Sequence, residues 1–164
     1  MDIQIYSKQL HRGQRTVKHY ARRFNVVICG RRWGKTDYSV ELCLESILLG
    51  HFVGLYAPVF KDIVDTWNAI KARLKPLISK IDESKYIIHF ITGGKIEFWS
   101  LKDKSCKEVS RGRKYHRVIY DETQKIDSEV LEENWEGVVA ITLTDFMGDA
   151  FFFGTPPDSK MHYF

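Results

Sequence analysis

The sequence contains few cysteines, no long apolar run and no internal repeat, and these absences exclude several classes of protein. Its three cysteines, Cys29, Cys43 and Cys106, show no paired metal-ligand spacing, and an odd number cannot all pair within one chain. We therefore expect reduced thiols, as in a cytoplasmic compartment. No apolar run approaches the length that crosses a bilayer, and residues 1–9 lack the apolar stretch of a secretion signal. The sequence thus predicts neither a membrane protein nor a secreted protein held by disulfides.

The overall composition is that of a soluble globular protein. Of the 164 residues, 44% are hydrophobic and 28% are charged, which suffices for one domain with a core but not comfortably for two. The formal net charge is +4, and basic residues are concentrated in segments 8–23 and 102–117. These segments are suited either to approach phosphate groups or to form solvated loops and helix ends, and composition leaves both interpretations open.

Strand-like and helix-like patterns alternate along the chain. Short apolar or β-branched runs predict strands at 24–29, 52–57, 86–91, 95–100, 117–120 and 151–153. Thr92-Gly93-Gly94 is a hairpin signal between two of these strands, and the polar segment 101–114 is expected to be a loop.

Helical spacing of apolar residues predicts three helices. The first begins at Thr36 and ends near Gly50, and the second covers 63–81 with a kink or early end at Pro76. The third covers 128–139, with Ser128 as a candidate N-cap. Strands that alternate with helices predict an α/β fold, in which a mostly parallel sheet is flanked by helices on both faces. Ligands of such sheets bind beyond the carboxyl ends of the strands.

Residues 29–36, Cys-Gly-Arg-Arg-Trp-Gly-Lys-Thr, connect the first expected strand to the first expected helix. The P-loop pattern is glycine, four free positions and Gly-Lys-Ser/Thr; Cys29 stands where the first glycine is expected, and Gly34-Lys35-Thr36 is intact. Backbone N–H groups of such a loop bind phosphates together with the positive end of the helix dipole. Lys35 is suited to reach the β- and γ-phosphates, and the Thr36 hydroxyl to bind Mg²⁺. An ordinary glycine-rich turn is the alternative, and the strand–loop–helix context favours a nucleotide site.

Two arginines, Arg31 and Arg32, lie inside this loop. Guanidinium groups beside a phosphate site stabilise charge that develops on the γ-phosphate. The alternative is that one or both point to solvent or pair with an acidic neighbour, and the sequence leaves both interpretations open.

Two acidic residues, Asp121 and Glu122, follow the apolar strand expected at 117–120. Asp121 is expected to hold Mg²⁺, directly or through water, and Glu122 to orient and polarise the attacking water. The alternative is a solvated acidic pair at the start of a loop; the P-loop upstream favours the catalytic interpretation.

A third motif, Gly154-Thr155-Pro156-Pro157, ends the last expected strand, and the Thr155 hydroxyl is placed to sense a γ-phosphate. Taken in order, the motifs resemble those of the large terminase subunits of tailed phages. The likeness covers residues 24–36 (Walker A), 110–122 (basic stretch and Walker B) and 135–164 (the segment with the coupling motif), and segment 10–14 resembles the glutamine motif.

The resemblance implies a P-loop NTPase of the RecA-like (ASCE) type and a role for each matching residue. Gln14 would contact adenine, although Arg12 stands where a proline is usual. Arg31 would act as the arginine finger, Lys35 and Glu122 would be catalytic, and Thr36 and Asp121 would hold the metal. Gly154 and Thr155 would couple hydrolysis to movement. The expected nucleotide-binding set is Gln14, Gly30, Arg31, Arg32, Trp33, Gly34, Lys35 and Thr36.

The same resemblance implies an incomplete domain. Large terminases carry a nuclease domain after the ATPase, and this sequence lacks the clustered acids of a two-metal nuclease. We therefore expect residues 1–164 to form a single P-loop ATPase domain, truncated at its C-terminal end, without nuclease activity.

The reaction that the resemblance implies is Mg²⁺-dependent hydrolysis of ATP that drives double-stranded viral DNA into a procapsid. The implied partners are duplex DNA, the portal protein and the small terminase subunit, in a homo-oligomeric ring without a membrane. The implied location is the host cytoplasm, transiently at the procapsid portal. Two alternatives stay open: another P-loop translocase or helicase, and a truncated nucleotide- and DNA-binding module with little turnover.

Overall fold

A seven-stranded sheet forms the centre of the protein in the computed structural model, which describes residues 5, 7–103 and 106–156. The strands follow the order β1-β7-β6-β2-β5-β4-β3 across the sheet. Their bounds are β1 (Phe24–Ile28), β2 (Phe52–Ala57), β3 (Ile78–Asp82), β4 (Ile87–Phe90), β5 (Lys95–Ser100), β6 (Arg117–Tyr120) and β7 (Asp149–Gly154). The pairs β1–β7, β7–β6, β6–β2 and β2–β5 are parallel, and the hairpin strands β4 and β3 extend the sheet antiparallel. The predicted α/β fold with a mostly parallel sheet is therefore confirmed.

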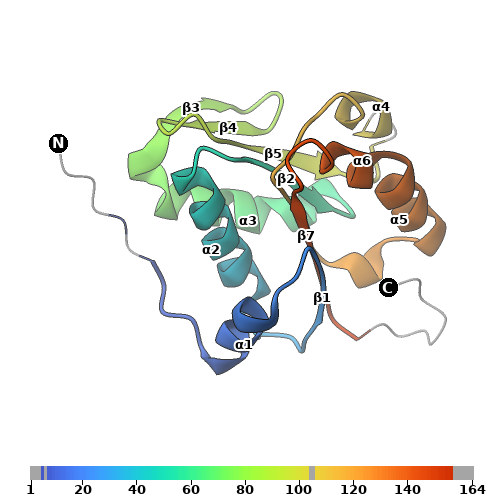
Figure 1. The fold of residues 1–164 in the computed structure, drawn as a ribbon, viewed down its shortest axis with the longest axis horizontal. Coiled ribbons are helices and arrows are strands. Elements are labelled where there is room, and N and C mark those ends of the chain that lie inside the picture. The colour runs from blue at the N-terminus through green and yellow to red at the C-terminus, as the bar shows by residue number, and fades with distance from the viewer. Residues whose placement is uncertain (1–4, 6, 104–105, 157–164) are drawn as a thin grey trace.

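Helices cover both faces of the sheet (Figure 1). Their bounds are α1 (Arg12–Tyr20), α2 (Lys35–Leu48), α3 (Phe60–Arg73), α4 (Cys106–Ser110), α5 (Ser128–Asn134) and α6 (Ala140–Thr142), with a π-helical turn, Trp135–Val139, between the last two. One core joins α2 and α3 to the sheet, and the other joins α4, α5 and the π-turn to the opposite face. Strand β7 contributes to both cores because its side chains alternate: Phe151 and Phe153 face the first, and Ala150 and Phe152 face the second.

Strand β7 lies between β1 and β6. It separates the strand before the glycine-rich loop from the strand before the acidic pair. The carboxyl ends of β1, β7 and β6 therefore share one edge of the sheet, because all three run parallel.

Of the two outcomes predicted at Pro76, a kink or an early end of the second helix, the structure has the early end, and the predicted range was wrong only beyond Arg73. Helix α3 ends there, a short 3₁₀ turn (Lys75–Leu77) contains Pro76, and strand β3 follows. Proline removes a backbone donor and clashes with the preceding turn, so the helix cannot continue through it. Ile78 and Ile81 belong to β3 at the edge of the sheet, although Ile81 continues the three- and four-residue spacing of the apolar residues in the helix.

Three smaller expectations also need correction. The N-cap of α5 is Asp127, whose carboxylate accepts hydrogen bonds from the Glu129 and Val130 amides, so the Ser128 assignment was wrong by one residue. Segment 101–114 contains the short helix α4, and α1 was not predicted at all. Among the described residues, no helix is both long enough and apolar enough to span a bilayer.

Candidate functional site

The loop between β1 and α2 places the start of a long helix at the edge where the parallel strands end. Gly34 precedes the helix with a φ of +87°, a conformation that glycine adopts without steric cost. Helix α2 begins at Lys35, and no side chain caps its N-terminus. Its first amide groups and its dipole are therefore available for an anion. At the other end of the loop, the Cys29 amide donates a 3.0 Å hydrogen bond to the Gly154 carbonyl, which ties the loop to the end of β7.

Helix α1 holds the same loop from outside the sheet. The Gln14 side chain, only 4% exposed, donates a 3.1 Å hydrogen bond to the Gly34 carbonyl and accepts one from the His11 amide. The His11 ring bonds to the Trp33 carbonyl at 2.7 Å and packs edge-on against the Trp33 indole. The structure thus brings Gln14 to the glycine-rich loop, as the glutamine motif implies, while its contact with adenine stays a prediction.

Lys35 and Glu122 face each other across this loop. The Lys35 ammonium lies 3.4 Å from a Glu122 carboxylate oxygen, and their side chains are 10% and 25% exposed. Both line a cavity of about 470 Å³, whose other walls are residues 31–34, 36 and 37. The predicted loop residues and one of the predicted acids therefore share one cavity.

A larger cavity of about 690 Å³ lies between the start of α3 and the strands β4 and β5. Its walls are mainly apolar and aromatic, including Phe60, Tyr86 and Trp99. We assign the candidate site to the smaller cavity, because the start of α2 and Glu122, which follows β6, both line it, and this combination suits phosphate chemistry.

Asp121 is a buried carboxyl group at the carboxyl end of β6. It is 5% exposed, and its carboxylate accepts a 2.9 Å hydrogen bond from the Glu122 amide. Burial raises the pKa of Asp121 to about 6, and the adjacent Glu122 charge adds to the rise, whereas Lys35 opposes it. A buried carboxylate of this kind gains from a nearby cation, which fits a magnesium ligand.

Thr36 supplies the second predicted metal ligand. It lies in the first turn of α2 and lines the cavity with Lys35 and Glu122. A hydroxyl and a carboxylate are the hard oxygen donors that Mg²⁺ prefers, so the chemistry of the two residues fits the ion that the motifs imply, while their roles as its ligands stay a prediction.

Glu122 is held in a specific orientation by its neighbours. Its φ of +51° is rare for a residue with a side chain and turns the chain sharply after β6. One carboxylate oxygen faces Lys35, and the other accepts a 2.6 Å hydrogen bond from Gln124 and lies 3.4 Å from Lys125. Burial would raise the pKa of Glu122, but the Gln124 hydrogen bond and the charges of Lys35 and Lys125 together lower it. Glu122 is therefore ionised at neutral pH.

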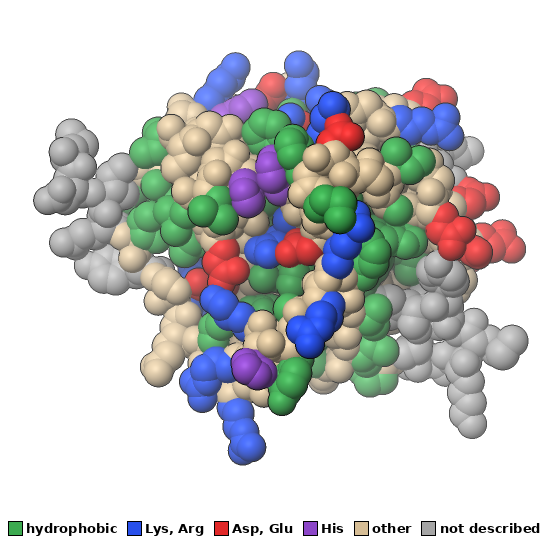
Figure 2. Space-filling model, in the orientation of Figure 1, with side chains coloured by type: hydrophobic (Ala, Val, Ile, Leu, Met, Phe, Trp, Pro, Cys, Tyr) green, Lys and Arg blue, Asp and Glu red, His purple; other side chains and the backbone are tan. Residues whose placement is uncertain are grey.

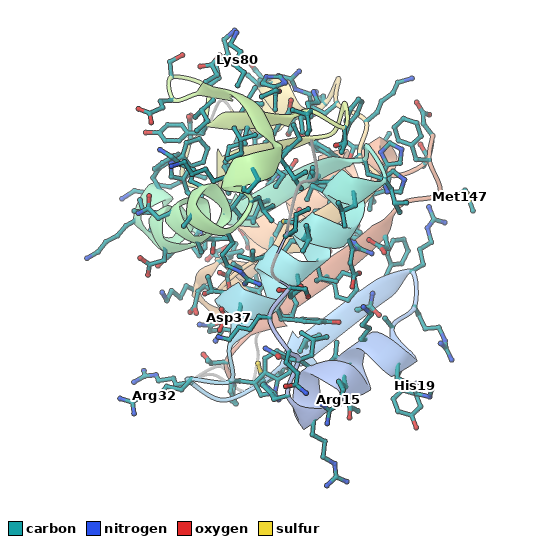
Figure 3. The ribbon with its side chains drawn as sticks, turned by 90° about the vertical axis from the view of Figure 1, so that its left-hand side faces the viewer. Arg15, His19, Arg32, Asp37, Lys80 and Met147 are labelled. Carbon is teal, nitrogen blue, oxygen red and sulfur yellow. The ribbon has the colours of Figure 1, made fainter. Side chains whose placement is uncertain are left out.

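The two loop arginines are both exposed. Arg31 and Arg32 line the cavity, and Arg32 points away from the body of the protein (Figure 3). Arg32 has a φ of +64°, a backbone conformation that is uncommon for a residue with a side chain. Of the two interpretations left open by the sequence, solvent exposure describes the conformation in this structure, and the finger role of Arg31 stays a prediction.

The third motif lies beside the acidic pair. The Thr155 amide donates a 3.0 Å hydrogen bond to the Gln124 side chain, and the buried Thr123 hydroxyl bonds to the Phe153 carbonyl at 2.9 Å. Gly154 accepts the bond from Cys29 described above. The structure therefore brings the third motif to the site, and its coupling role stays a prediction; Pro157 lies outside the described residues.

Several of these contacts could not be found from the motifs. Gln124, Lys125 and Thr123 form a 3₁₀ turn (Thr123–Lys125) after the acidic pair, and Lys125 also bonds to Asp62 of α3 at 2.9 Å. Only the position of Gln124, two residues after Glu122, gave a signal, since residues that directly follow an acid at a strand end belong to the same loop.

The basic segments predicted from composition are partly neutralised by acidic partners. Ion pairs join Lys8 to Asp37, Lys18 to Glu45, Arg113 to Glu97, Lys114 to Asp145 and Arg117 to Asp149. On the face shown in Figure 2, lysine and arginine side chains are interspersed with acidic and hydrophobic ones. These observations favour solvated or paired basic groups over one continuous basic surface on that face.

The fold and the arrangement of the loop define the class: this is a P-loop NTPase fold. Comparison with solved structures identifies proteins that share this fold. The chain is similar to the large terminase ATPase domain of Thermus phage P74-26, with a TM-score of 0.75 and 15% identity over 93% of this chain and 67% of that one. It is also similar to the large terminase of a thermophilic bacteriophage (TM-score 0.70, 15% identity, 91% of this chain and 40% of that one) and to that of bacteriophage HK97 (TM-score 0.69, 13% identity, 92% and 34%).

No protein-family model and no curated protein matches the sequence. At these low identities the likeness is one of fold. The resemblance predicted from the motifs is thus confirmed at that level: the chain has the fold of the ATPase domain of phage large terminases. It spans about two thirds of the P74-26 domain and well under half of the other two chains.

Proposed function

We propose that this chain is a Mg²⁺-dependent ATP hydrolase that powers the packaging of viral double-stranded DNA. The observation that carries the proposal is the approach of Lys35, at the start of α2, to Glu122, at the end of β6, across a cavity of about 470 Å³. A cation at a helix start and a carboxylate at the end of a nearby parallel strand are groups that support water attack on a γ-phosphate.

Phosphate binding is the task of Lys35 and the first amides of α2. The triphosphate competes with Glu122 for the Lys35 ammonium, because both are anions and Lys35 is itself the first residue of α2. Binding therefore separates the 3.4 Å ion pair and frees one Glu122 oxygen. That oxygen accepts a hydrogen bond from the attacking water, and the low pKa of Glu122 keeps it ionised for this role.

Charge on the phosphates is neutralised by Lys35, and Arg31 is proposed to add a second cation from the loop. Thr36 and Asp121 would hold Mg²⁺, which offsets the charge on the β- and γ-phosphate oxygens when it is bound. Gln14, whose side chain donates a hydrogen bond to the Gly34 carbonyl, would contact adenine.

The proposed cargo and assembly come from the likeness in fold to the large terminases. We propose that several copies of the ATPase form a ring around duplex DNA and act with a portal protein and a small terminase subunit in the host cytoplasm. Contacts to the DNA would involve its phosphate backbone and would not read sequence.

Isothermal titration calorimetry and a phosphate-release assay test the proposal on the full chain. Lys35→Ala is expected to abolish MgATP binding, whereas Glu122→Gln binds MgATP and releases no phosphate. Matched controls are Lys61→Ala and Glu132→Gln, which change exposed residues outside the cavity. Full hydrolysis by Glu122→Gln would remove this residue from the mechanism.

Two further measurements separate the alternatives. A packaging ATPase is stimulated by duplex DNA and does not unwind it, so strand separation in a helicase assay would assign the chain to another class of translocase. Tight MgATP binding without any phosphate release by the wild type would favour a binding module.

A further inference from the structure

The Gln124 side chain joins the acidic pair to the third motif. Its amide nitrogen donates a 2.6 Å hydrogen bond to Glu122, and its amide oxygen accepts a 3.0 Å hydrogen bond from the Thr155 backbone. Gln124 therefore contacts both segments through one planar group, half-buried between them. Glutamine is suited to this place because a carboxylate cannot donate to Glu122 and an ammonium cannot accept from Thr155.

The surroundings make this link stiff. Gln124 lies in the 3₁₀ turn (Thr123–Lys125), and Thr123 anchors that turn to β7 by its buried 2.9 Å bond to the Phe153 carbonyl. On the opposite side, Lys125 anchors the turn to α3 through Asp62. The turn is thus fixed at two points, so a displacement of the Glu122 carboxylate is transmitted through Gln124 rather than absorbed by the turn.

The two oxygens of Glu122 have different partners. One faces Lys35, and the other bonds to Gln124. When a bound triphosphate draws the Lys35 ammonium away from Glu122, only the carboxylate oxygen that faces Lys35 loses its partner. Gln124 then keeps the carboxylate oriented toward the position that Lys35 occupied.

We propose that Gln124 is a positioning residue: it orients the Glu122 carboxylate for water attack and transmits the state of that carboxylate to the backbone at Thr155. The first part of this inference, the orientation of Glu122 for water attack, rests on the proposed ATPase function. Its second half, the link to Thr155, is a property of the chain without nucleotide and is testable separately.

Three substitutions of Gln124 test its two hydrogen bonds separately. Gln124→Met removes both and keeps the side-chain length. Gln124→Glu keeps an acceptor for Thr155 and loses the donor to Glu122. Gln124→Lys keeps a donor for Glu122 and loses the acceptor. Gln9→Met is the control, because Gln9 is exposed and outside the candidate site.

Amide hydrogen exchange, followed by NMR on the full chain without nucleotide, tests the link to Thr155. Exchange at Thr155 is expected to accelerate in Gln124→Met and Gln124→Lys, and to stay slow in Gln124→Glu and Gln9→Met. Equal exchange in all four variants would overturn the link, whether or not the chain binds ATP.

Kinetics and calorimetry test the effect on Glu122. Gln124→Met and Gln124→Glu are expected to lower kcat roughly 10-fold or more, with the Kd for MgATP within about twofold of wild type. Gln124→Lys is expected to recover part of kcat, which a general loss of folding would not produce. Unchanged kcat in Gln124→Met would overturn the positioning role, whereas absence of MgATP binding by the wild type would overturn the proposed function and leave the Thr155 result standing.

Discussion

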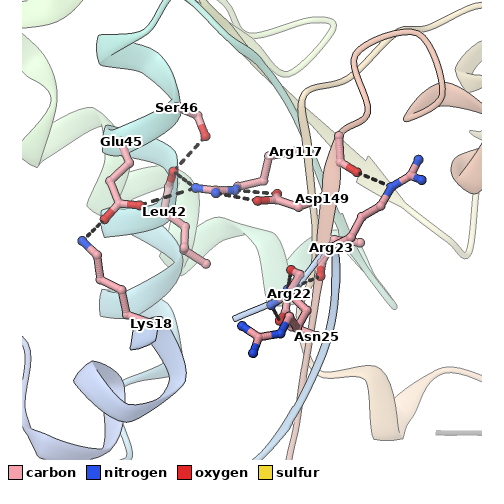
Figure 4. A network of polar contacts seen from close by, with 11 residues as sticks. Lys18, Arg22, Arg23, Asn25, Leu42, Glu45, Ser46, Arg117 and Asp149 are labelled. Carbon is pink, nitrogen blue, oxygen red and sulfur yellow. Dashed lines mark hydrogen bonds and ion pairs between the residues drawn. The ribbon is translucent and has the colours of Figure 1, made fainter. Parts of the chain in front are cut away.

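The Arg117 guanidinium donates two hydrogen bonds, each 2.7 Å long, to the two carboxylate oxygens of Asp149, directly across the β6–β7 pair (Figure 4). A third bond of 3.0 Å reaches the Leu42 carbonyl in α2. The arginine therefore connects two neighbouring strands to the helix that begins at the candidate site. Burial alone would lower the pKa of Arg117, but the Asp149 carboxylate raises it overall.

Loss of the Asp149 charge is expected to destabilise the protein. In Asp149→Asn the guanidinium stays largely buried with a weaker partner, so the free energy of unfolding is expected to fall by about 1.5–3 kcal/mol in urea denaturation. Asp145→Asn is the matched control, because its pair with Lys114 is exposed and is expected to leave the urea midpoint unchanged. Equal effects of the two substitutions would contradict a special contribution of the Arg117 bridge.

Removal of the Asp121 charge is expected to stabilise the protein at neutral pH while abolishing activity. Because burial raises the pKa of Asp121 from 3.8 to about 6, the folded state binds the proton more tightly than the unfolded state. The ionised group therefore destabilises the fold above about pH 6, and this penalty disappears as the pH falls from about 6 to about 4. Asp121→Asn keeps the acceptor for the Glu122 amide and is expected to gain roughly 1–3 kcal/mol at pH 7.5.

The measurement is thermal or urea unfolding of wild type and Asp121→Asn without magnesium, from pH 4 to 8. The difference between the two proteins is expected to shrink toward zero at the acidic end. A constant difference across this range would show that Asp121 titrates normally in the folded state.

Substitution of Gly34 is expected to distort the loop. Alanine at a φ of +87° is strained, and its Cβ would lie 3.0 Å from the Gln14 amide nitrogen. Gly34→Ala is therefore expected to lose about 1–2 kcal/mol of stability and to weaken MgATP binding. Gly137→Ala is the control, since no atom lies within 4 Å of the added Cβ, and it is expected to be neutral or stabilising.

One thiol is expected to react in the native protein. Cys43 and Cys106 are buried, and burial raises the pKa of each to about 12, so they are protected from a disulfide reagent. Cys29 is half-buried in the loop, with a pKa raised by burial, and is expected to react slowly. All three are expected to react in denaturant, and MgATP is expected to slow Cys29 alone. Fast labelling of any thiol in the folded chain would contradict this burial.

Elements with a strong local signal were predicted well. The runs at 52–57, 95–100 and 117–120 match β2, β5 and β6, because buried strands of a parallel sheet are continuous apolar segments. Helix α1 gave no such signal. Its only buried residue is Gln14 and its start is capped by His11, while Val17 is only partly buried against the core, so polar contacts with the loop supply much of what holds it.

Strand β3 was missed for a related reason. Its residues Ile78 and Ile81 have helical spacing, and an edge strand with polar neighbours has little alternation to identify it. In the candidate site, the motif residues were predictable, but the Gln124 link and the Lys125–Asp62 contact were not, because they depend on how a short turn packs between β7 and α3.

The order of residues alone determined the glycine-rich turn before α2 and the acidic pair after β6. Their chemistry and their strand–loop context are local, since glycine and apolar runs act over a few neighbouring residues. Only the tertiary structure placed Lys35 opposite Glu122 and joined Glu122 to Thr155. The insertion of β7 between β1 and β6 brings these distant segments to one edge, and such pairing arises from the burial of whole strand faces rather than from any local preference.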